Sequence, residues 1–313
     1  MFEDNVNMSG AEVKFSIVVP LYNKERHIKR AMRSVLNQSH RNFELIVVDD
    51  NSTDSSVAIV EAIQDPRVRL LKRTTPGPGG YAARNLGIIS AQNPWIAFLD
   101  ADDEWNDGYL AEIAKAIVRN PGCRVFCSGF VYQNTHDQRP ARYTKKNRGQ
   151  GSHLFSFGTF LRNKPIWTGA VVIEKDLIIK AGKFPEEKSK RGGDQDCWLR
   201  VMFEARQGCW VDYIGAIYHR DSDNMVTRSV PFEVNQHVML ETIGKLLKLE
   251  QDQKNRLALK VHWNKTASVY FKNAAKSRVL SPKQLEAYYW TFSKRDFRIL
   301  LYFIYSLRNL RLH

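Results

Sequence analysis

The sequence predicts an α/β fold, in which helices flank a mostly parallel β-sheet and an all-helical C-terminal extension follows. Two observations predict this. Up to about Arg119, short runs of β-branched residues alternate with helical segments, the pattern of strand–helix–strand units. After about Pro231, only helical patterns occur. We therefore expect an α/β domain over residues 12–228 and a helical extension over residues 229–313.

The alternating part begins with a buried strand at Phe15–Val19, which Pro20 is expected to end. Apolar residues at helical spacing then predict a helix over residues 24–37. The same patterns continue along the chain and predict strands at 43–48, 67–71 and 95–99, and helices at 54–63, 81–91 and 108–118.

Beyond residue 119 the alternation is weaker. Apolar runs predict strands at 125–131 and 169–174, and a helix over 195–206 is expected to end near Gly208. The last quarter predicts helices at 232–249, 253–276 and 281–310. Ser281 and Pro282 supply an N-cap and a first helical residue for the last of these.

Composition excludes several classes of protein. Hydrophobic residues make up 43% and charged residues 26% of the 313 residues, which excludes a disordered chain, a collagen-like repeat and a disulfide-dense module. The net charge is +14, and residues 231–313 hold 15 Lys and Arg against 6 Asp and Glu. A second basic run consists of Arg139, Arg142, Lys145, Lys146 and Arg148. Such excess attracts nucleic acid, anionic lipid or phosphorylated ligands, and a solvated surface is the simpler alternative.

Polar clusters follow the first, second and fourth predicted strands. They are Pro20–Asn23, Asp49–Ser52 and Asp100–Asp103. In an open parallel sheet, ligands bind beyond the carboxyl ends of the strands. An Asp-x-Asp pair at such an end offers hard oxygens to Mg²⁺ or Mn²⁺ and leaves positions for phosphate oxygens. Turn and cap chemistry is the alternative explanation of these acids.

Five motifs occur in one order between Phe15 and Asp221: SIVVPLYN, ELIVVDDNSTDSS, GYAARNLGI, WIAFLDADDEW and GGDQDCWLR. With these motifs the chain resembles the family 2 glycosyltransferases of GT-A fold, of the bacterial non-processive type. The resemblance implies a Rossmann-related GT-A fold and an inverting transfer of one sugar from a nucleotide-diphosphate sugar. It further implies Mn²⁺ or Mg²⁺ as cofactor, UDP as the more frequent nucleotide, and a glycan or lipid-linked acceptor. Cell-surface polysaccharide or lipopolysaccharide synthesis is the expected setting.

The resemblance also implies roles for single residues. Pro20, Tyr22 and Asp50 would hold the base and ribose of the donor, and Arg84 would lie near the diphosphate or nucleotide. The complete set expected to bind the nucleotide sugar is Pro20, Tyr22, Asn23, Asp49, Asp50, Arg84 and Asp100.

The expected metal ligands are Asp100 and Asp102, of which Asp102 is the more direct. His219 is a further candidate for the metal or the diphosphate, and a packed histidine is the alternative. Lys72, Arg73 and Arg220 are alternative partners of the diphosphate.

The family's Glu-Asp pair, whose Asp is the general base, maps onto Gly193-Asp194, so the Glu is missing here. Asp194 is the expected base, and Asp196, two residues away, is its competitor. Asp194 is expected at the start of a helix, where the dipole favours the ionised form, and an ordinary cap is the alternative. Asp196, Trp198 and Arg200 match the family's DxWxR.

Other classes of function remain as alternatives. Gly77–Ala82 imitates a dinucleotide-binding loop but follows the third strand instead of the first. A nucleotidyltransferase would share the metal chemistry, and a glycoside hydrolase would share the paired carboxylates. The basic, aromatic C-terminal part also fits a nucleic-acid-binding protein, although helical spacing of its aromatic residues favours packing, so no nucleic-acid partner is expected.

We expect a cytoplasmic protein. Cys123, Cys127, Cys197 and Cys209 show no metal-binding spacing and are expected to be free thiols, and no stretch is long enough to span a bilayer. Lys294–Tyr305 sets cations beside an apolar, aromatic run. Such a helix either lies on the anionic inner face of the plasma membrane or packs on the catalytic domain or a second subunit of a homo-oligomer.

Overall fold

The computed structural model describes residues 12–135, 137–186, 191–220 and 238–276, with short pieces at 299–301 and 304. The chain divides into two compact units, Met1–Pro231 and Phe232–His313. The boundary expected near residue 228 lies outside the described residues.

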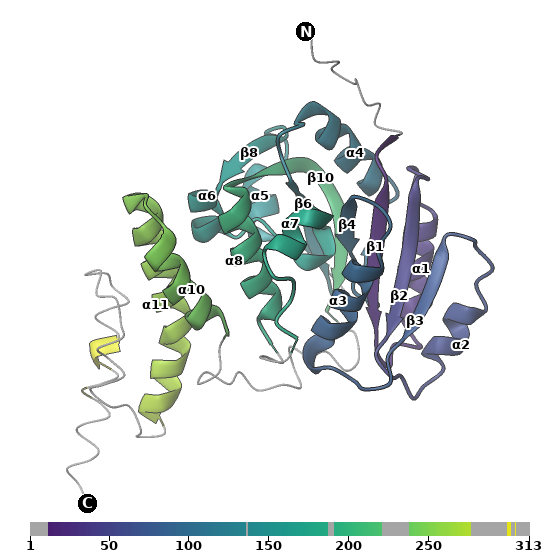
Figure 1. Ribbon diagram of the computed structural model, residues 1–313, viewed down its shortest axis with the longest axis horizontal. Coiled ribbons are helices and arrows are strands. Elements are labelled where there is room, and N and C mark those ends of the chain that lie inside the picture. Colours follow the sequence, from purple (N-terminus) through teal and green to yellow (C-terminus); the bar gives the residue numbers. More distant parts are fainter. Residues whose placement is uncertain are drawn as a thin grey trace, which may run out of the picture. The chain divides into compact units, whose positions relative to one another are not determined.

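The first unit is built on one sheet with the strand order β3-β2-β1-β4-β9-β6-β10-β5 (Figure 1). Its first four strands are parallel, as the sequence predicts: β1 Phe15–Leu21, β2 Phe43–Asp49, β3 Val68–Lys72 and β4 Trp95–Phe98. Every residue of β2 is buried and only Pro20 of β1 is partly exposed, because both faces of these strands are covered.

The other half of the sheet is mixed. β9 (Val171–Glu174) runs antiparallel to β4 and to β6 (Val125–Gln133), whereas β10 (Gln207–His219) runs parallel to β6. Three short antiparallel strands complete it: β5 Glu104–Trp105, β7 Gln138–Pro140 and β8 His153–Ser156. The mixed sheet agrees with the predicted α/β class. Its strands are parallel in two parts, β3-β2-β1-β4 and β6-β10.

Helices cover both faces of the sheet. On one face, α1 (Ile28–Leu36) and α4 (Tyr109–Arg119) share one buried core with alternate residues of β1 and β2, such as Ile17 and Leu45, and α4 contacts β6 and β10. On the other face lie α3 (Tyr81–Ser90) and α8 (Gly193–Ala205), and a Cβ at Gly87 of α3 would meet Val18 Cγ1 at 2.4 Å. The remaining helices of this unit are α2 Ser56–Glu61, α5 Arg142–Asn147, α6 Phe157–Asn163 and α7 Lys175–Lys180.

Pro20 does not end β1, contrary to the prediction. Leu99 N donates to Val18 O, and Asp50 N donates to Leu21 O, so alternate residues of β1 face β4 and β2. Pro20 faces the β4 side, where β4 has already ended opposite Val18. The N–H that proline lacks is therefore not needed in the sheet.

Two helix ends also differ from the prediction. α1 begins at Ile28 because the N–H groups of Asn23, Lys24 and Glu25 donate to side chains of the 52–56 loop instead of a helix. α8 ends at Ala205, and the next residue, Arg206, has a left-handed φ of 63°, whereas Gly208 lies in β10.

The second unit contains α10 (Val238–Leu249) and α11 (Gln253–Lys276), with buried residues such as Ile243, Leu246 and Leu259. The helix predicted over 281–310, with Lys294–Tyr305, lies almost wholly outside the described residues. No helix in the described part of the chain is long and apolar enough to cross a membrane.

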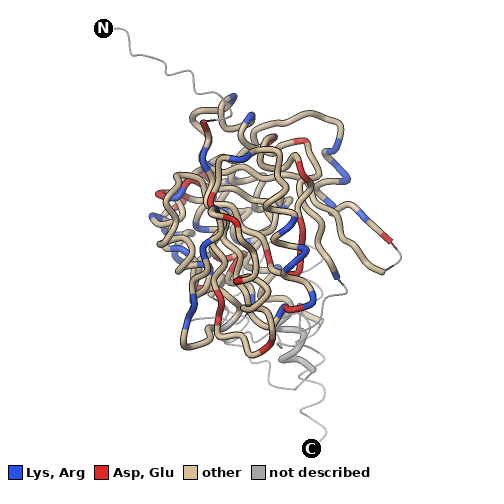
Figure 2. The backbone as a smooth tube through the Cα atoms, turned by 90° about the vertical axis from the view of Figure 1, so that its right-hand side faces the viewer, with Lys and Arg blue, Asp and Glu red and all other residues tan. Residues whose placement is uncertain are grey.

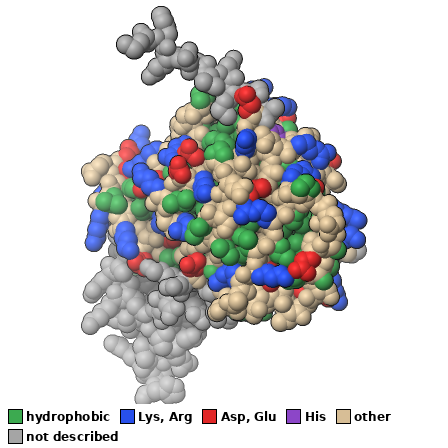
Figure 3. Space-filling model, turned by 45° about the vertical axis from the view of Figure 1, so that its right-hand side comes forward, with side chains coloured by type: hydrophobic (Ala, Val, Ile, Leu, Met, Phe, Trp, Pro, Cys, Tyr) green, Lys and Arg blue, Asp and Glu red, His purple; other side chains and the backbone are tan. Residues whose placement is uncertain are grey.

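Basic and acidic residues are interspersed along the described chain (Figure 2). On the face drawn in Figure 3, Lys and Arg lie among Asp, Glu and uncharged side chains. The basic run at 139–148 forms β7 and α5, where Tyr143 and Thr144 are buried. The four cysteines are free and buried, as expected.

Candidate active site

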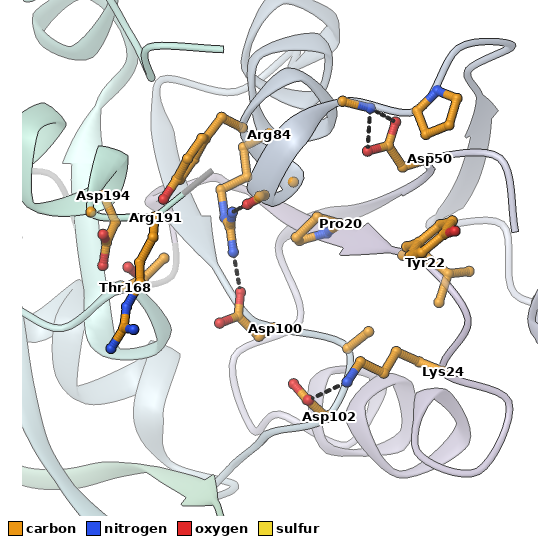
Figure 4. A pocket seen from close by; sticks show the side chains of 18 of the residues that line it. Pro20, Tyr22, Lys24, Asp50, Arg84, Asp100, Asp102, Thr168, Arg191 and Asp194 are labelled. Atoms are coloured by element: carbon orange, nitrogen blue, oxygen red, sulfur yellow. Dashed lines mark hydrogen bonds and ion pairs between the residues drawn. The ribbon is translucent and has the colours of Figure 1, made fainter. Parts of the chain in front are cut away.

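A cavity of about 380 Å³ lies where β1, β2 and β4 end. Figure 4 shows Pro20, Tyr22 and Asp50 on one side of it, Asp194, Arg191 and Thr168 on the other, and Arg84 and Asp100 between them. The lining therefore combines the polar ends of the parallel strands with segments from the second half of the domain. This is the position at which ligands bind in open α/β sheets.

The two acids that follow β2 have different roles. Asp50 lines the cavity, and its carboxylate accepts hydrogen bonds from Gly77 N, at 3.1 and 3.2 Å, and from Arg73. Asp49 lies outside the lining, and its carboxylate accepts from Ser52 N, which closes the turn. Only Asp50 of this pair faces the cavity. Arg73, an alternative diphosphate partner, is held by Asp50.

Asn23 does not line the cavity either. It has a left-handed φ of 50°, and its Oδ1 accepts from Thr53 N at 2.8 Å. Its backbone N donates to Ser52 Oγ at 3.0 Å. Asn23 therefore joins the loops after β1 and β2, and in this way fixes Pro20 and Tyr22, which do line the cavity.

A glycine-rich segment before α3 forms one wall. Gly79 and Gly80 both have φ of +69°, a region that glycine enters without strain. A Cβ at Gly80 would meet Arg84 Nη1 at 3.3 Å, and Gly79 O accepts from the same nitrogen at 3.2 Å. These residues let the backbone pass close to Arg84.

Arg84, on α3, is buried at the centre of the site. Its Nη2 lies 2.5 Å from Asp100 Oδ1, and its guanidinium lies 5.7 Å above the Phe184 ring. Burial acts to lower the pKa of Arg84, but the charge of Asp100 and their hydrogen bond outweigh it, so the pKa is raised. Arg84 is thus a permanent cation.

The three acids that follow β4 point in different directions. Asp100 and Asp102 line the cavity, and Asp102 Oδ2 lies 2.7 Å from Lys24 Nζ. Asp103 points away and accepts from His219 N at 2.9 Å. Burial, and then the charges of Asp102 and Asp100, raise the pKa of Asp103 well above its ordinary value. The cavity therefore receives the Asp-x-Asp pair alone.

The pair fits a Mg²⁺ or Mn²⁺ ion in the chemistry of its donors. Both carboxylates face the cavity and offer hard oxygens. Among the described residues, no group of three or more His, Cys, Asp and Glu is placed to hold a metal. A metal held by this pair would need further ligands, and phosphate oxygens and water are the ones that Mg²⁺ takes in phosphate-binding sites.

His219 ends β10, and its Nε2 lies 3.3 Å from Glu104 Oε1. It does not line the cavity, but the preceding Tyr218 does. Arg220 is likewise outside the lining, and its guanidinium lies 5.5 Å from the centre of the Tyr132 ring.

Asp194 lines the cavity from the first turn of α8. Burial raises its pKa, and the hydrogen bond from Gln195 N and the charge of Arg84 only partly oppose this. The N–H groups of the helix terminus favour the ionised form, as expected, but desolvation outweighs them. A carboxylate with a raised pKa is a stronger base.

Gly193 replaces the family's Glu for a reason visible in the packing. A Cβ at this position would meet the Tyr81 ring at 2.8 Å and Pro185 Cγ at 3.0 Å. Gly193 N donates to Tyr81 Oη at 2.9 Å. Tyr81, which also lines the cavity, thus occupies the space that a longer side chain would take.

Asp196, the competitor of Asp194, is buried outside the cavity lining. It pairs with Arg200, at 2.8 Å to Nη2, and Arg200 also donates to Ala181 O and to Lys183 O. Trp198 packs on Phe98 and Phe184, with ring centroids 5.7 and 5.2 Å away. The three residues of the DxWxR match thus hold α8 against its neighbours.

Sequence analysis missed several residues of the lining, among them Lys24, Tyr81, Trp167, Thr168, Arg191 and Tyr218. Lys24 directly follows the motif SIVVPLYN and Tyr81 lies within GYAARNLGI, which is a signal that could have found them. Trp167 stacks on Phe130, with centroids 4.4 Å apart, and lies 5.3 Å from the Tyr218 ring. These contacts join distant parts of the chain and leave no local signal.

The parallel first half and mixed second half of this sheet agree with a GT-A fold, and Asp100 and Asp102 lie at its carboxyl edge. Residues 16–170 match the model of the family "Glycosyl transferase family 2". The chain belongs to this family.

Curated relatives agree with this membership. An uncharacterized glycosyltransferase of Rickettsia conorii is 43% identical over 196 residues, which are 61% of this chain and 30% of that protein. The minor teichoic acid biosynthesis protein GgaA of Bacillus subtilis is 38% identical over 107 residues, 32% of this chain and 24% of GgaA. The chain thus spans less than a third of these relatives.

The fold also resembles that of the Staphylococcus aureus protein TarS, residues 1–349, in complex with UDP-GlcNAc. The TM-score is 0.67 at 18% identity, over 94% of this chain and 81% of that one.

Proposed function

We propose that this chain transfers one sugar from a nucleotide-diphosphate sugar, with UDP as the nucleotide, to a hydroxyl of a glycan or lipid-linked acceptor. The observation that carries the proposal is that Asp50, Arg84, Asp100, Asp102 and Asp194 all line one cavity. The similarity to TarS, solved with UDP-GlcNAc, supports UDP. The similarity to GgaA supports a role in making a cell-surface polymer.

The nucleotide belongs at the Pro20, Tyr22 and Asp50 side of the cavity. Tyr22 is 51% exposed, which leaves its ring free for stacking on a base. Asp50 has carboxylate oxygens to accept hydrogen bonds from ribose hydroxyls. Arg84 would then lie within reach of the diphosphate and offset its charge.

Asp100 and Asp102 would hold a Mg²⁺ or Mn²⁺ ion, which offsets the charge on the departing diphosphate as a Lewis acid. Asp194 takes the proton from the acceptor hydroxyl as its oxygen bonds to the anomeric carbon. The bond from that carbon to the diphosphate breaks, and its electron pair leaves with the nucleotide diphosphate. One base and no enzyme nucleophile give a single displacement with inversion.

The acceptor belongs at the Asp194 side, where Thr168, Arg191, Trp167 and Tyr218 line the cavity. Aromatic faces suit the apolar face of a sugar ring, and the polar groups suit its hydroxyls. Family polysaccharide synthases that add many sugars carry a Gln-x-x-Arg-Trp motif, which this sequence lacks, so we infer transfer of one sugar per encounter.

A panel of nucleotide sugars with Mn²⁺ tests the proposal directly. We expect a UDP-sugar to release UDP in the presence of glycan or glycolipid acceptors, with a new glycoside as the second product. Release of a sugar 1-phosphate would instead identify nucleotidyl transfer. Failure of every nucleotide sugar to bind or react would contradict the proposed function.

A further inference from the structure

Each carboxylate of the Asp-x-Asp pair already holds a cation from the chain itself (Figure 4). Asp100 pairs with Arg84, and Asp102 Oδ2 lies 2.7 Å from Lys24 Nζ. The side chains of Lys24 and Asp102 are only 12% and 14% exposed, so solvent screens this ion pair little. The cation that offsets Asp102 is therefore part of the site.

The two cations are held differently. Arg84 is fixed by Gly79 O as well as Asp100 and lies over the Phe184 ring. The Lys24 ammonium is a compact charge at the end of a flexible stem. Its backbone N–H donates to Ser56 Oγ at 2.8 Å, so the loop is anchored at this residue. Lys24 can move its charge by side-chain rotation alone.

We propose that Lys24 is an internal counter-ion of Asp102. Its ammonium group leaves the Asp102 carboxylate when a divalent ion and the donor diphosphate bind together. The ammonium then pairs with a diphosphate oxygen, the kind of partner for which a lysine point charge is suited. This inference rests on the proposed function and adds a residue that couples the metal to the nucleotide.

The coupling between metal binding and nucleotide binding follows from the charges in the site. Without nucleotide, a divalent ion at Asp102 must displace the ammonium or lie beside it, and both weaken metal binding. The diphosphate supplies negative charge for the divalent ion and for the Lys24 ammonium at once. Metal and nucleotide should therefore strengthen each other's binding, and by linkage the factor is the same in both directions.

Mn²⁺ binding to the full chain, followed by electron paramagnetic resonance with and without UDP, tests this without any sugar or acceptor. In the wild type we expect weak binding of Mn²⁺ alone and a UDP-dependent gain of about 5- to 150-fold, the usual range of coupling. Lys24→Met removes the charge but keeps an apolar stem. It should tighten binding of Mn²⁺ alone, weaken binding of UDP, and reduce the coupling factor.

Lys24→Gln, a second neutral variant, should behave like Lys24→Met. Lys115→Met is the matched control, because Lys115 pairs with Glu112 at 2.7 Å on the exposed surface, outside the cavity lining, and should leave all three quantities unchanged. Wild-type Mn²⁺ affinity and coupling in both neutral variants would overturn the exchange while leaving the proposed function intact. If the wild type bound UDP but no Mn²⁺, the metal dependence and the exchange would both be overturned.

Discussion

Asp194 and Asp196 lie two residues apart on one helix, and their surroundings separate their roles. Asp194 lines the cavity, whereas Asp196 is buried in an ion pair with Arg200. Asp194→Asn keeps the shape of the side chain and loses the proton acceptor. We expect the transfer rate to fall about 10²- to 10⁴-fold with little change in UDP affinity, measured by steady-state kinetics and calorimetry.

The matched control is Asp196→Asn, which breaks the ion pair to Arg200 and should mainly lower the melting temperature. If Asp196→Asn reduced the rate at constant UDP affinity while Asp194→Asn stayed active, the assignment of the base would be reversed.

Gly193 is the residue at which this chain departs from the family's Glu-Asp pair. Gly193→Ala would put a Cβ 2.8 Å from the Tyr81 ring, and the ring is packed too tightly to yield freely. We expect a loss of about 1–3 kcal/mol in the free energy of unfolding, the usual cost of overpacking, measured by urea denaturation. Gly122→Ala is the control, because nothing lies within 4 Å of a Cβ there. Equal stability of the two variants would contradict this explanation.

Among the elements, the four parallel strands are joined at their amino ends by Glu44 of β2. Its carboxylate accepts from Ser16 Oγ and Gln92 N, both at 2.6 Å, and from Arg69 Nη1 at 2.5 Å. Burial acts to raise the pKa of Glu44, but these hydrogen bonds and the Arg69 charge outweigh it and lower the pKa.

The lowered pKa means that Glu44 stabilises the fold above its unfolded pKa, near the ordinary 4.5, and that this contribution is lost as the pH falls through the folded pKa. Glu44→Gln should therefore cost about 1–3 kcal/mol of unfolding free energy near neutral pH and less in acid. Urea denaturation of both proteins at about pH 7 and about pH 4 measures this difference. A cost that does not shrink in acid would contradict the assignment.

Local sequence patterns were sufficient to predict most of the strands and helices in the first half of the fold. Strands such as 43–48 and helices such as 108–118 could be predicted because apolar spacing reports burial directly. β5 and β7 could not, because they have two and three residues and form through their partners. α5 was missed because its polar sequence hides three buried residues, Tyr143, Thr144 and Asn147.

The residues of the candidate site likewise divide into those that could be predicted from the sequence and those that could not. Asp50, Asp100 and Asp102 could be found because acids at strand ends are visible in the sequence. Asn23 and Asp49 also follow strands and look equivalent, but the Asp49 side chain closes a turn and the Asn23 side chain joins two loops. Only tertiary contacts show that difference.

For the whole molecule, the basic excess and the Lys294–Tyr305 segment bear on where the protein acts. This segment lies almost wholly outside the described residues, so its membrane role stays a prediction from the sequence. We expect the full chain to cosediment with anionic vesicles more than with neutral ones, and less at high salt, because each cation near such a surface contributes about 1 kcal/mol.

Replacing the cations Lys294, Arg295 and Arg298 by Gln is the matched variant, and it should reduce cosedimentation. An absence of vesicle binding at low salt would favour packing of the segment on the catalytic domain or on a second subunit.

We propose that Asp100 and Asp102 make sugar transfer depend on a divalent ion. The most direct measurement is the rate of UDP release from the UDP-sugar that the panel identifies, for the wild type and Asp102→Asn, with Mn²⁺ and with excess chelator. We expect turnover by the wild type with Mn²⁺ only, and none by Asp102→Asn, whose fold should be unchanged. Full wild-type activity in excess chelator would contradict the claim.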